Sequence, residues 1–201
     1  QDFEVVVRGE VSGLSNHPTG VYFSLQDEDK KALLQCYMPP FVYKAAGVVL
    51  EDGMQVQVGG QASMYKPKGR FSFLVRTLEL TGEGTIQKAY ELLKKQLKAQ
   101  GLFDRKRELP DCLSRVALVT SATGAVQADF RNNLIKRGIK IDLYNVLVEG
   151  ARAAADIVGA LQRVYARASQ YDVVVLVRGG CSLEDLQAFN SEPVAKTLFA
   201  S

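Results

Sequence analysis

The sequence has 201 residues, of which 47% are hydrophobic and 23% are charged, a composition typical of a soluble globular protein. No run approaches the roughly 18 apolar residues of a membrane span, and no secretory signal opens the chain, so we expect a cytoplasmic protein with no membrane contact. The formal net charge of +3 permits a nucleic-acid partner without requiring one. The 3 cysteines lie far apart without a CxxC motif, which predicts neither a disulfide framework nor a zinc site.

The first 80 residues read as short strands separated by turn signals. In the segment 21–27, Val21, Phe23 and Leu25 alternate with more polar residues, a pattern typical of a half-buried strand. Gly59 and Gly60 predict a bulge within a later strand. The predicted strands cover residues 5–10, 21–27, 31–38, 54–65 and 71–80, with a loop at 15–20, a short helix at 41–50 and a hairpin loop at 66–70.

Five strands with one helix between the third and the fourth follow the order of an OB-fold barrel. Another small barrel or a sandwich remains the alternative, because the number of strands alone rarely determines topology.

The hydrophobic period changes from strand-like to helical after residue 84. A helix that ends at Gly101 is predicted from a stripe formed by Ile86, Ala89, Tyr90, Leu93 and Leu97. Strands are then predicted at 116–120, 141–148 and 173–177, alternating with helices at 122–137, 155–169 and 182–190.

Apolar strands that alternate with helices predict a parallel, Rossmann-like α/β sheet covered on both faces. The expected fold is therefore an α/β protein with an all-β N-terminal domain. The predicted domains are an OB-fold domain at 1–81, a linker helix and connector at 82–110, and an α/β domain at 111–201 that is truncated at its C-terminal end.

In open parallel sheets, ligands bind beyond the carboxyl ends of the strands. This rule selects the loops at 120–124, 148–150 and 178–182. Arg178 leaves the end of an apolar strand and is followed by Gly179 and Gly180, which allow close approach of a ligand.

Ser182 and Asp185 have the spacing of a capping box, which predicts a helix N-terminus in the same loop as Arg178. An arginine beside glycines and a helix N-terminus indicates an anion site. The alternative is a tight turn whose arginine only forms an ion pair with Glu184 or Asp185.

The first loop of the sheet has a similar composition, with Ser121, Thr123 and Gly124 before a predicted helix that carries Asp129 about one turn inside. A carboxylate and a guanidinium at one edge can serve one phosphate, the first handling water and the second stabilising charge. The alternative for Asp129 is an ordinary exposed acid on a helix.

The sequence lacks the residues that several other kinds of active or binding site require. The single histidine, His17, lies in the β-rich part, so no Ser-His-Asp triad is available in the α/β part of this sequence. The usual glycine-rich fingerprints for dinucleotides and nucleoside triphosphates are also absent. Cys181 lacks a histidine partner, and we interpret it as a packing thiol rather than a nucleophile.

At residues 178–195 the sequence reads RGGCSLEDLQAFNSEPVA, which resembles the signature of the large subunit of bacterial exodeoxyribonuclease VII. Residues 9–15 and 19–29, which read GEVSGLS and TGVYFSLQDED, resemble the N-terminal motifs of that family. Residues 82–104 resemble its linker helix, and VTSATGAVQADF at 119–130 resembles its TS-x-TGA-x-x-x-D element. The resemblance covers some 190 residues in the family's order.

The resemblance implies an OB-fold that binds single-stranded DNA and an α/β nuclease that cuts single strands to oligonucleotides and 5'-phosphomononucleotides. It implies catalytic roles for Asp129 and Arg178 and no required cofactor, since the family is regarded as metal-independent and Mg²⁺ is compatible but not needed. It also implies assembly with a small helical subunit through a C-terminal region. Cys181 departs from the family, which usually has a third glycine there.

The family places a further catalytic His and Asp in an element that follows the FN motif, and this sequence stops at Ser201 before such an element. We therefore expect a piece of a longer subunit that binds DNA but does not cut it alone. The rival hypotheses are a non-catalytic module that binds single-stranded DNA and an unrelated α/β enzyme that acts on a small phosphorylated ligand.

OB-folds bind single strands through stacked aromatic side chains and a basic groove. The candidates for DNA contact are Tyr22, which faces outward on the second strand, and Lys66, Lys68 and Arg70 in the hairpin between the fourth and fifth strands. Tyr65 and Phe71 flank that hairpin, and either of them is also a candidate for the core.

Overall fold

The computed structural model describes residues 5–27, 29, 31–65, 69–104, 106–123, 125–135, 137–179 and 182–200. Contacts divide the chain into two compact units, Gln1–Lys95 and Gln96–Ser201. The division falls inside helix α2 (Glu83–Ala99), which begins in the first unit and ends in the second.

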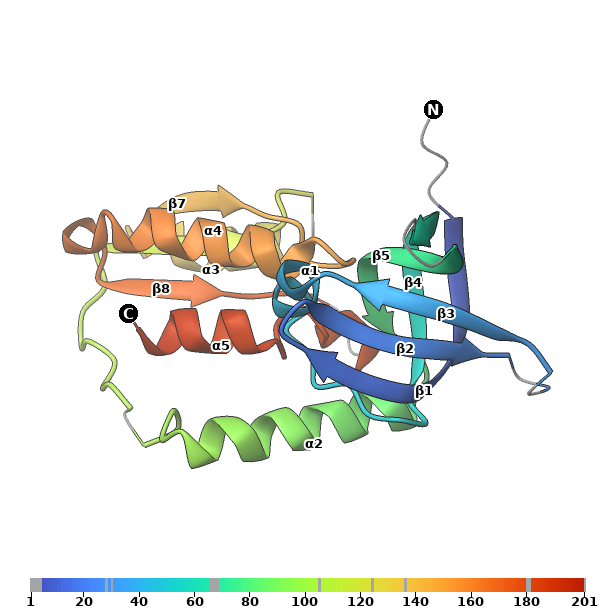
Figure 1. Ribbon diagram of the computed structural model, residues 1–201. Coiled ribbons are helices and arrows are strands. Elements are labelled where there is room, and N and C mark those ends of the chain that lie inside the picture. Colours follow the sequence, from blue (N-terminus) through green and yellow to red (C-terminus); the bar gives the residue numbers. More distant parts are fainter. Residues whose placement is uncertain are drawn as a thin grey trace. The chain divides into compact units, whose positions relative to one another are not determined.

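The first unit is a closed barrel of five strands (Figure 1). Its strands close in the order β1-β2-β3-β5-β4, and only the contact between β3 and β5 is parallel. The predicted OB-fold topology is thereby confirmed. The elements are β1 (Val5–His17), β2 (Gly20–Gln26), β3 (Leu33–Met38), α1 (Pro40–Ala46), β4 (Gln55–Tyr65) and β5 (Arg70–Leu80).

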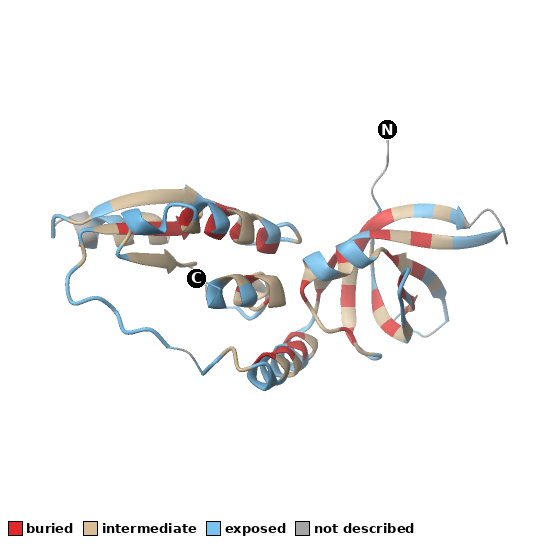
Figure 2. Cartoon of the chain, turned by 60° about the vertical axis from the view of Figure 1, so that its left-hand side comes forward, coloured by how far each residue is buried: buried red, intermediate tan, exposed pale blue. Residues whose placement is uncertain are grey.

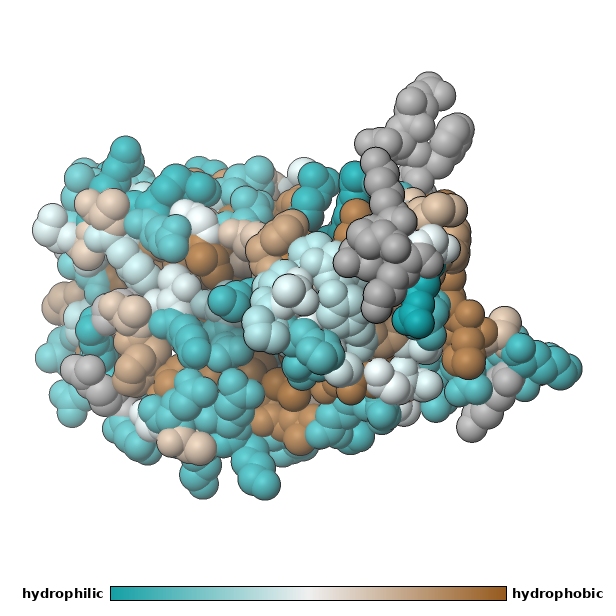
Figure 3. Space-filling model, viewed as in Figure 1, coloured by the Kyte–Doolittle hydropathy of each residue, from teal (hydrophilic) through white to brown (hydrophobic). Residues whose placement is uncertain are grey.

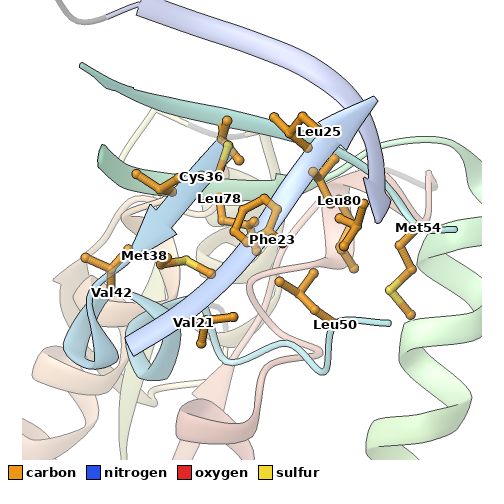
Figure 4. Packing of buried hydrophobic residues seen from close by; sticks show 14 of the residues in the cluster. Val21, Phe23, Leu25, Cys36, Met38, Val42, Leu50, Met54, Leu78 and Leu80 are labelled. Carbon is orange, nitrogen blue, oxygen red and sulfur yellow. The ribbon is translucent and has the colours of Figure 1, made fainter. Parts of the chain in front are cut away.

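The barrel interior is filled by the apolar residues of the alternating pattern. Val21, Phe23 and Leu25 are at most 4% exposed, and Figure 4 shows them among Cys36, Met38 and other apolar residues. Burying each such large side chain contributes about 1.5–3 kcal/mol. Figure 2 shows the resulting alternation of buried and more exposed positions along the barrel strands.

The predicted bulge in β4 is confirmed, because the register of the β4–β5 pair shifts between Gly59 and Gly60. A Cβ on Gly60 would overlap the carbonyl oxygen of Leu74. Only glycine therefore fits where β4 passes so close to β5.

Three predictions in this unit are wrong. The helix predicted at 41–50 is α1, which ends at Ala46 because Gly47 caps it in a left-handed conformation. β1 does not end before residue 15 but continues to His17, because Ser15, Asn16 and His17 pair with β2 after an irregularity that follows Ser12. Tyr90 is 36% exposed, whereas the other members of its predicted stripe on α2 are buried. Its ring lies toward solvent, with the Nζ of Lys94 5.5 Å from the ring centroid.

The second unit contains a parallel sheet in the order β7-β6-β8 (Figure 1). Ala117 and Val119 of the central strand pack with α4 and α5 on one face, while Val116 and Leu118 are equally buried on the other. The predicted parallel α/β sheet is confirmed. The elements are β6 (Arg115–Thr120), α3 (Ala125–Ile135), β7 (Lys140–Asn145), α4 (Ala153–Tyr165), η2 (Ala168–Gln170), β8 (Val173–Leu176), η3 (Glu184–Leu186) and α5 (Glu192–Phe199).

Two strands differ from prediction, β7 in its extent and β8 in its burial. β7 ends at Asn145 rather than at 148, so the loop that follows it is longer. β8 is an edge strand that pairs with β6 on one side only, and its residues are half-buried rather than fully buried.

The helix predicted at 182–190 is wrong. That segment contains only the short 3-10 turn η3, and the helix begins later, at Glu192. Pro193 suits the observed start at Glu192, because proline is favoured in the first turn of a helix.

Among the described helices, none combines the length and the apolar character that crossing a membrane requires.

Candidate active site and nucleic-acid surface

The carboxyl ends of β6, β7 and β8 bring three loops together in the second unit. The backbone N–H of Ala122, after β6, donates to Oδ1 of Asn145 at the end of β7, at 2.8 Å. Arg178, after β8, reaches Glu149 in the loop after β7. A Cβ on Gly179 would lie 2.6 Å from Cγ2 of Val126, so the third loop also approaches the start of α3. The three predicted loops therefore form one region.

Arg178 is the most buried charged group of this region, with only 8% of its side chain exposed. Its Nη2 lies 3.1 Å from Oδ1 of Asp185 and 3.3 Å from Oε2 of Glu149. The ion pair with Asp185 is the one that the alternative hypothesis of a simple turn anticipates. Both ion pairs engage Nη2, which is only one of the three nitrogen atoms of the guanidinium.

The Nε and Nη1 atoms of Arg178 are buried and have no hydrogen-bond partner among the described residues. Buried polar atoms are nearly always paired, and leaving a charged donor unpaired costs several kcal/mol, on the order of 3. A group in this state is suited to an acceptor that arrives from outside the protein, and a phosphate oxygen is such an acceptor.

The predicted cap hydrogen bond is present, because the backbone N–H of Asp185 donates to Oγ of Ser182 at 3.1 Å. It caps the turn η3 rather than an α-helix, so the predicted helix N-terminus is not available to an anion. The bond instead fixes Asp185 close to Arg178.

Asp129 lies on α3 and is exposed. Its backbone carbonyl accepts a hydrogen bond from Nδ2 of Asn133 at 2.9 Å. Within the described part of the chain, no hydrogen bond or ion pair joins the carboxylate of Asp129 to Arg178. α3, which carries Asp129, begins in the loop after β6, one of the three loops at this edge of the sheet.

The loop after β6 is held by its own hydroxyl groups. Oγ of Ser121 lies 3.1 Å from Oγ1 of Thr123 and accepts the backbone N–H of Thr123 at 3.4 Å. The other predicted loop residues, Gly124 and Gly180, lie outside the described residues, as does Cys181.

On the barrel, the outer face of β2 and β3 carries an aromatic cluster. Tyr22 is 40% exposed, and its ring centroid lies 5.1 Å from that of Tyr37, at an interplanar angle of 36°. His17 packs edge-on against Tyr22, with ring centroids 5.6 Å apart. The hydroxyl of Tyr37 donates to the carbonyl of Thr19 at 2.9 Å. The predicted outward position of Tyr22 is confirmed.

The hairpin between β4 and β5 presents a mixed basic and apolar surface. Arg70 is exposed, and Phe71 and Met64 form an exposed cross-strand pair, with 57% and 63% of their surface accessible. Phe71 therefore does not belong to the core. Figure 3 shows brown, apolar areas among the teal, hydrophilic surface of the molecule. Lys66 and Lys68, and the side chain of Tyr65, lie outside the described residues.

Sequence reasoning did not single out Tyr37 and Glu149. Tyr37 lies between buried Cys36 and Met38, so strand alternation alone predicts that it faces outward beside Tyr22. Glu149 belongs to a loop that the carboxyl-end rule selected, but no local signal showed that it would contact Arg178.

Two family models match the chain. Residues 1–79 match an OB-fold nucleic acid binding domain, and residues 102–201 match the large subunit of exonuclease VII.

Curated relatives match both units together. An exodeoxyribonuclease 7 large subunit from Sulfurimonas denitrificans is 39% identical, covering 98% of this chain and 48% of the relative. One from Streptococcus pyogenes serotype M5 is 38% identical, covering 98% of this chain and 44% of the relative. The chain thus spans about half the length of the curated relatives it matches.

Among solved structures, the N-terminal domain of the PriB protein from Thermoanaerobacter tencongensis is 18% identical. That match covers 41% of this chain and 100% of the other, with a TM-score of 0.33. The two family models and the identity to the curated relatives along 98% of the sequence show that the chain belongs to the family of exonuclease VII large subunits.

Proposed function

We propose that this chain is the DNA-binding and partly catalytic portion of an exodeoxyribonuclease large subunit. The reaction is hydrolysis of phosphodiester bonds in single-stranded DNA to oligonucleotides and 5'-phosphomononucleotides. The observation that carries the proposal is Arg178, a buried guanidinium with unpartnered Nε and Nη1 at the carboxyl edge of a parallel sheet.

The chemistry of the reaction suits that guanidinium. Attack of water on a phosphodiester concentrates negative charge on the non-bridging oxygens, and positioned N–H donors stabilise this charge most strongly in a water-poor site. A fixed arginine can donate two parallel hydrogen bonds to such oxygens, which a lysine cannot do. In this role Arg178 contacts the reacting phosphate directly.

Asp129 is proposed to orient or deprotonate the attacking water. The family resemblance supports this role, and its place on α3, which starts at the same edge of the sheet, is compatible with it. Water gives its proton to the carboxylate and its oxygen to phosphorus, and the bond from phosphorus to the leaving oxygen breaks. The general acid that protonates the leaving oxygen is proposed to be the histidine of the family's next element.

The barrel is proposed to hold the single strand and to supply most of the affinity. Tyr22 and Tyr37 offer aromatic faces for bases, and Arg70, Lys66 and Lys68 are proposed to contact phosphates. Stacking accepts every base, so binding is expected to be largely independent of sequence.

Further parts of the proposal rest on the family resemblance. Cleavage is proposed to need no metal and to persist in EDTA, and the active subunit is proposed to assemble with a small helical subunit. The protein is proposed to act in the cytoplasm.

The second candidate is a non-catalytic module that binds single-stranded DNA. The ion pairs of Arg178 with Asp185 and Glu149 favour it, because they would satisfy an arginine with a purely structural role. The unpartnered Nε and Nη1 favour the nuclease instead.

The experiment that separates the candidates compares two proteins on labelled single-stranded and double-stranded DNA. Residues 1–201 are expected to bind single strands selectively without cutting them. The subunit extended to the length of its relatives, with its small partner, is expected to cut single strands. An extended, assembled subunit that binds single strands but never shortens them would establish the non-catalytic module.

A further inference from the structure

Arg178 is held at one nitrogen by two carboxylates that differ in their surroundings. Glu149 approaches Nη2 at 3.3 Å, and 74% of its side chain is exposed. Asp185 approaches the same atom at 3.1 Å and is 36% exposed. Asp185 is also fixed through its own backbone, which donates to Oγ of Ser182. Nη2 donates a hydrogen bond to Glu149, but an ion pair with so exposed a partner is strongly screened and contributes little. The less exposed Asp185 is therefore the stronger electrostatic partner of the guanidinium.

The contacts at Nη2 limit how the guanidinium of Arg178 can bind a phosphate. Arginine binds a phosphate through a fork of two parallel N–H groups, either Nε with Nη2 or Nη1 with Nη2. Nη2 belongs to both forks, and each of its hydrogens serves one of them. Nη2 donates a hydrogen bond to Glu149, and the ion-paired Asp185 lies 3.1 Å from the same atom, so the two carboxylates crowd the nitrogen that both forks share. Nε and Nη1 have no partner among the described residues. Release of Glu149 frees the Nη2 hydrogen that it accepts and opens the fork to which that hydrogen belongs.

We propose that Asp185 is a positioning residue that fixes Arg178, whereas Glu149 is a counter-ion that an incoming phosphodiester displaces. This inference rests on the proposed function, in which Arg178 contacts the reacting phosphate. Access supports the division of roles. Only 8% of the Arg178 side chain is exposed, so a ligand reaches it when a neighbour moves, and Glu149 is the more exposed neighbour.

The positioning role is tested by the mobility of Arg178 in the 201-residue chain. Nitrogen-15 relaxation of its Nε–Hε group is measured, with the signal assigned by its loss in Arg178→Lys. Asp185→Ala, which removes the ion pair, is expected to make the group mobile. Glu149→Gln is expected to leave it ordered. An equally rigid Arg178 in Asp185→Ala would overturn the positioning role.

The displacement is tested by titrating inorganic phosphate and following the same Nε–Hε signal. Glu149→Gln removes the competing charge and is expected to bind phosphate about two- to fivefold more tightly than the unchanged chain. Glu108→Gln makes the same charge change at an exposed position of the connector and is expected to have no effect. Affinity that is unchanged or weaker in Glu149→Gln, or a signal that phosphate never shifts, would overturn the displacement.

Neither measurement depends on cleavage. Failure of the nuclease proposal would appear as undiminished turnover by Arg178→Lys in the full-length subunit, whereas failure of this inference appears in the mobility and phosphate affinity of residues 1–201. The two failures are therefore distinguishable.

Discussion

Tyr22 and Tyr37 lie directly opposite each other on β2 and β3, with ring centroids 5.1 Å apart. Gly20 makes room for this pair, because a Cβ there would lie 2.5 Å from Cε2 of Tyr37. OB-folds bind oligonucleotides on the face of their second and third strands, and the tyrosine pair occupies that face. We therefore propose the tyrosine pair as a platform for stacking bases.

Replacing either tyrosine with alanine is expected to weaken binding of single-stranded DNA by about 1–3 kcal/mol, the contribution of one base stacked on an aromatic ring. Fluorescence anisotropy of a labelled oligothymidine measures the loss. Phe41→Ala is the matched control, since Phe41 is an aromatic residue of the same unit and is 73% exposed on α1. If Phe41→Ala costs as much affinity as Tyr37→Ala, the platform is misplaced.

The β4–β5 hairpin is expected to contact phosphates. Changing Lys66, Lys68 and Arg70 together to alanine removes up to three phosphate contacts, so the slope of log affinity against log salt should flatten by about 2. The same titration on a variant with Lys140, Arg163 and Arg167 changed to alanine, all exposed in the second unit, should keep its slope. Unchanged affinity of the hairpin variant at moderate salt would refute this placement.

Replacing Gly60 with alanine is expected to lower the stability of the protein, whereas replacing Gly84 with alanine is expected to raise it. At Gly60 the added methyl group overlaps the backbone of β5, and overpacking of this kind costs about 1–3 kcal/mol. Gly84 lies on α2 with nothing within 4 Å of an added Cβ, so alanine should stabilise the protein by about 0.4–1 kcal/mol. Urea denaturation measures both, and a Gly60→Ala variant as stable as the unchanged chain would contradict the close approach of β4 and β5 at the bulge.

Cys36 and Cys112 are expected to differ in reactivity. Burial of Cys36 in the barrel raises the pKa of its thiol to about 12, whereas Cys112 is exposed. The thiolate is the reactive form, so at pH 8 Cys36 stays protonated as well as shielded. Peptide mapping after brief treatment with iodoacetamide should find Cys112 modified and Cys36 intact. Equal modification of both would show that the barrel opens readily.

Much of the fold was predictable because it depends on local patterns. The alternation of Val21, Phe23 and Leu25 and the paired glycines at 59 and 60 act through strand geometry, and both predictions are confirmed. The helix predicted at 182–190 was wrong because the Ser182–Asp185 capping pattern also fits a short turn: its hydrogen bond caps η3, and the α-helix starts only at Glu192. Tyr90 fitted the helical period of α2 but lies at the exposed border of its stripe.

The candidate site was only partly predictable from the sequence, because only some of its features depend on local patterns or on the order of the elements. The rule on carboxyl ends of parallel strands selected the three loops and Arg178, since it depends only on the order of the elements. The contact between Arg178 and Glu149 joins residues 29 apart in the sequence. Such a contact depends on how two loops fold over the sheet edge, which no local pattern reveals.

Turnover of Arg178→Lys shows whether Arg178 stabilises the reacting phosphate, as we propose. Single-turnover cleavage of labelled single-stranded DNA is measured in the full-length subunit assembled with its small partner, with Asp129→Asn as a second variant. Both variants should cut about 100-fold or more slowly, the scale of losing one oxyanion donor, while binding is retained because the barrel supplies most of the affinity. Near-normal turnover by Arg178→Lys would contradict the account and leave Arg178 as a turn residue held by its ion pairs.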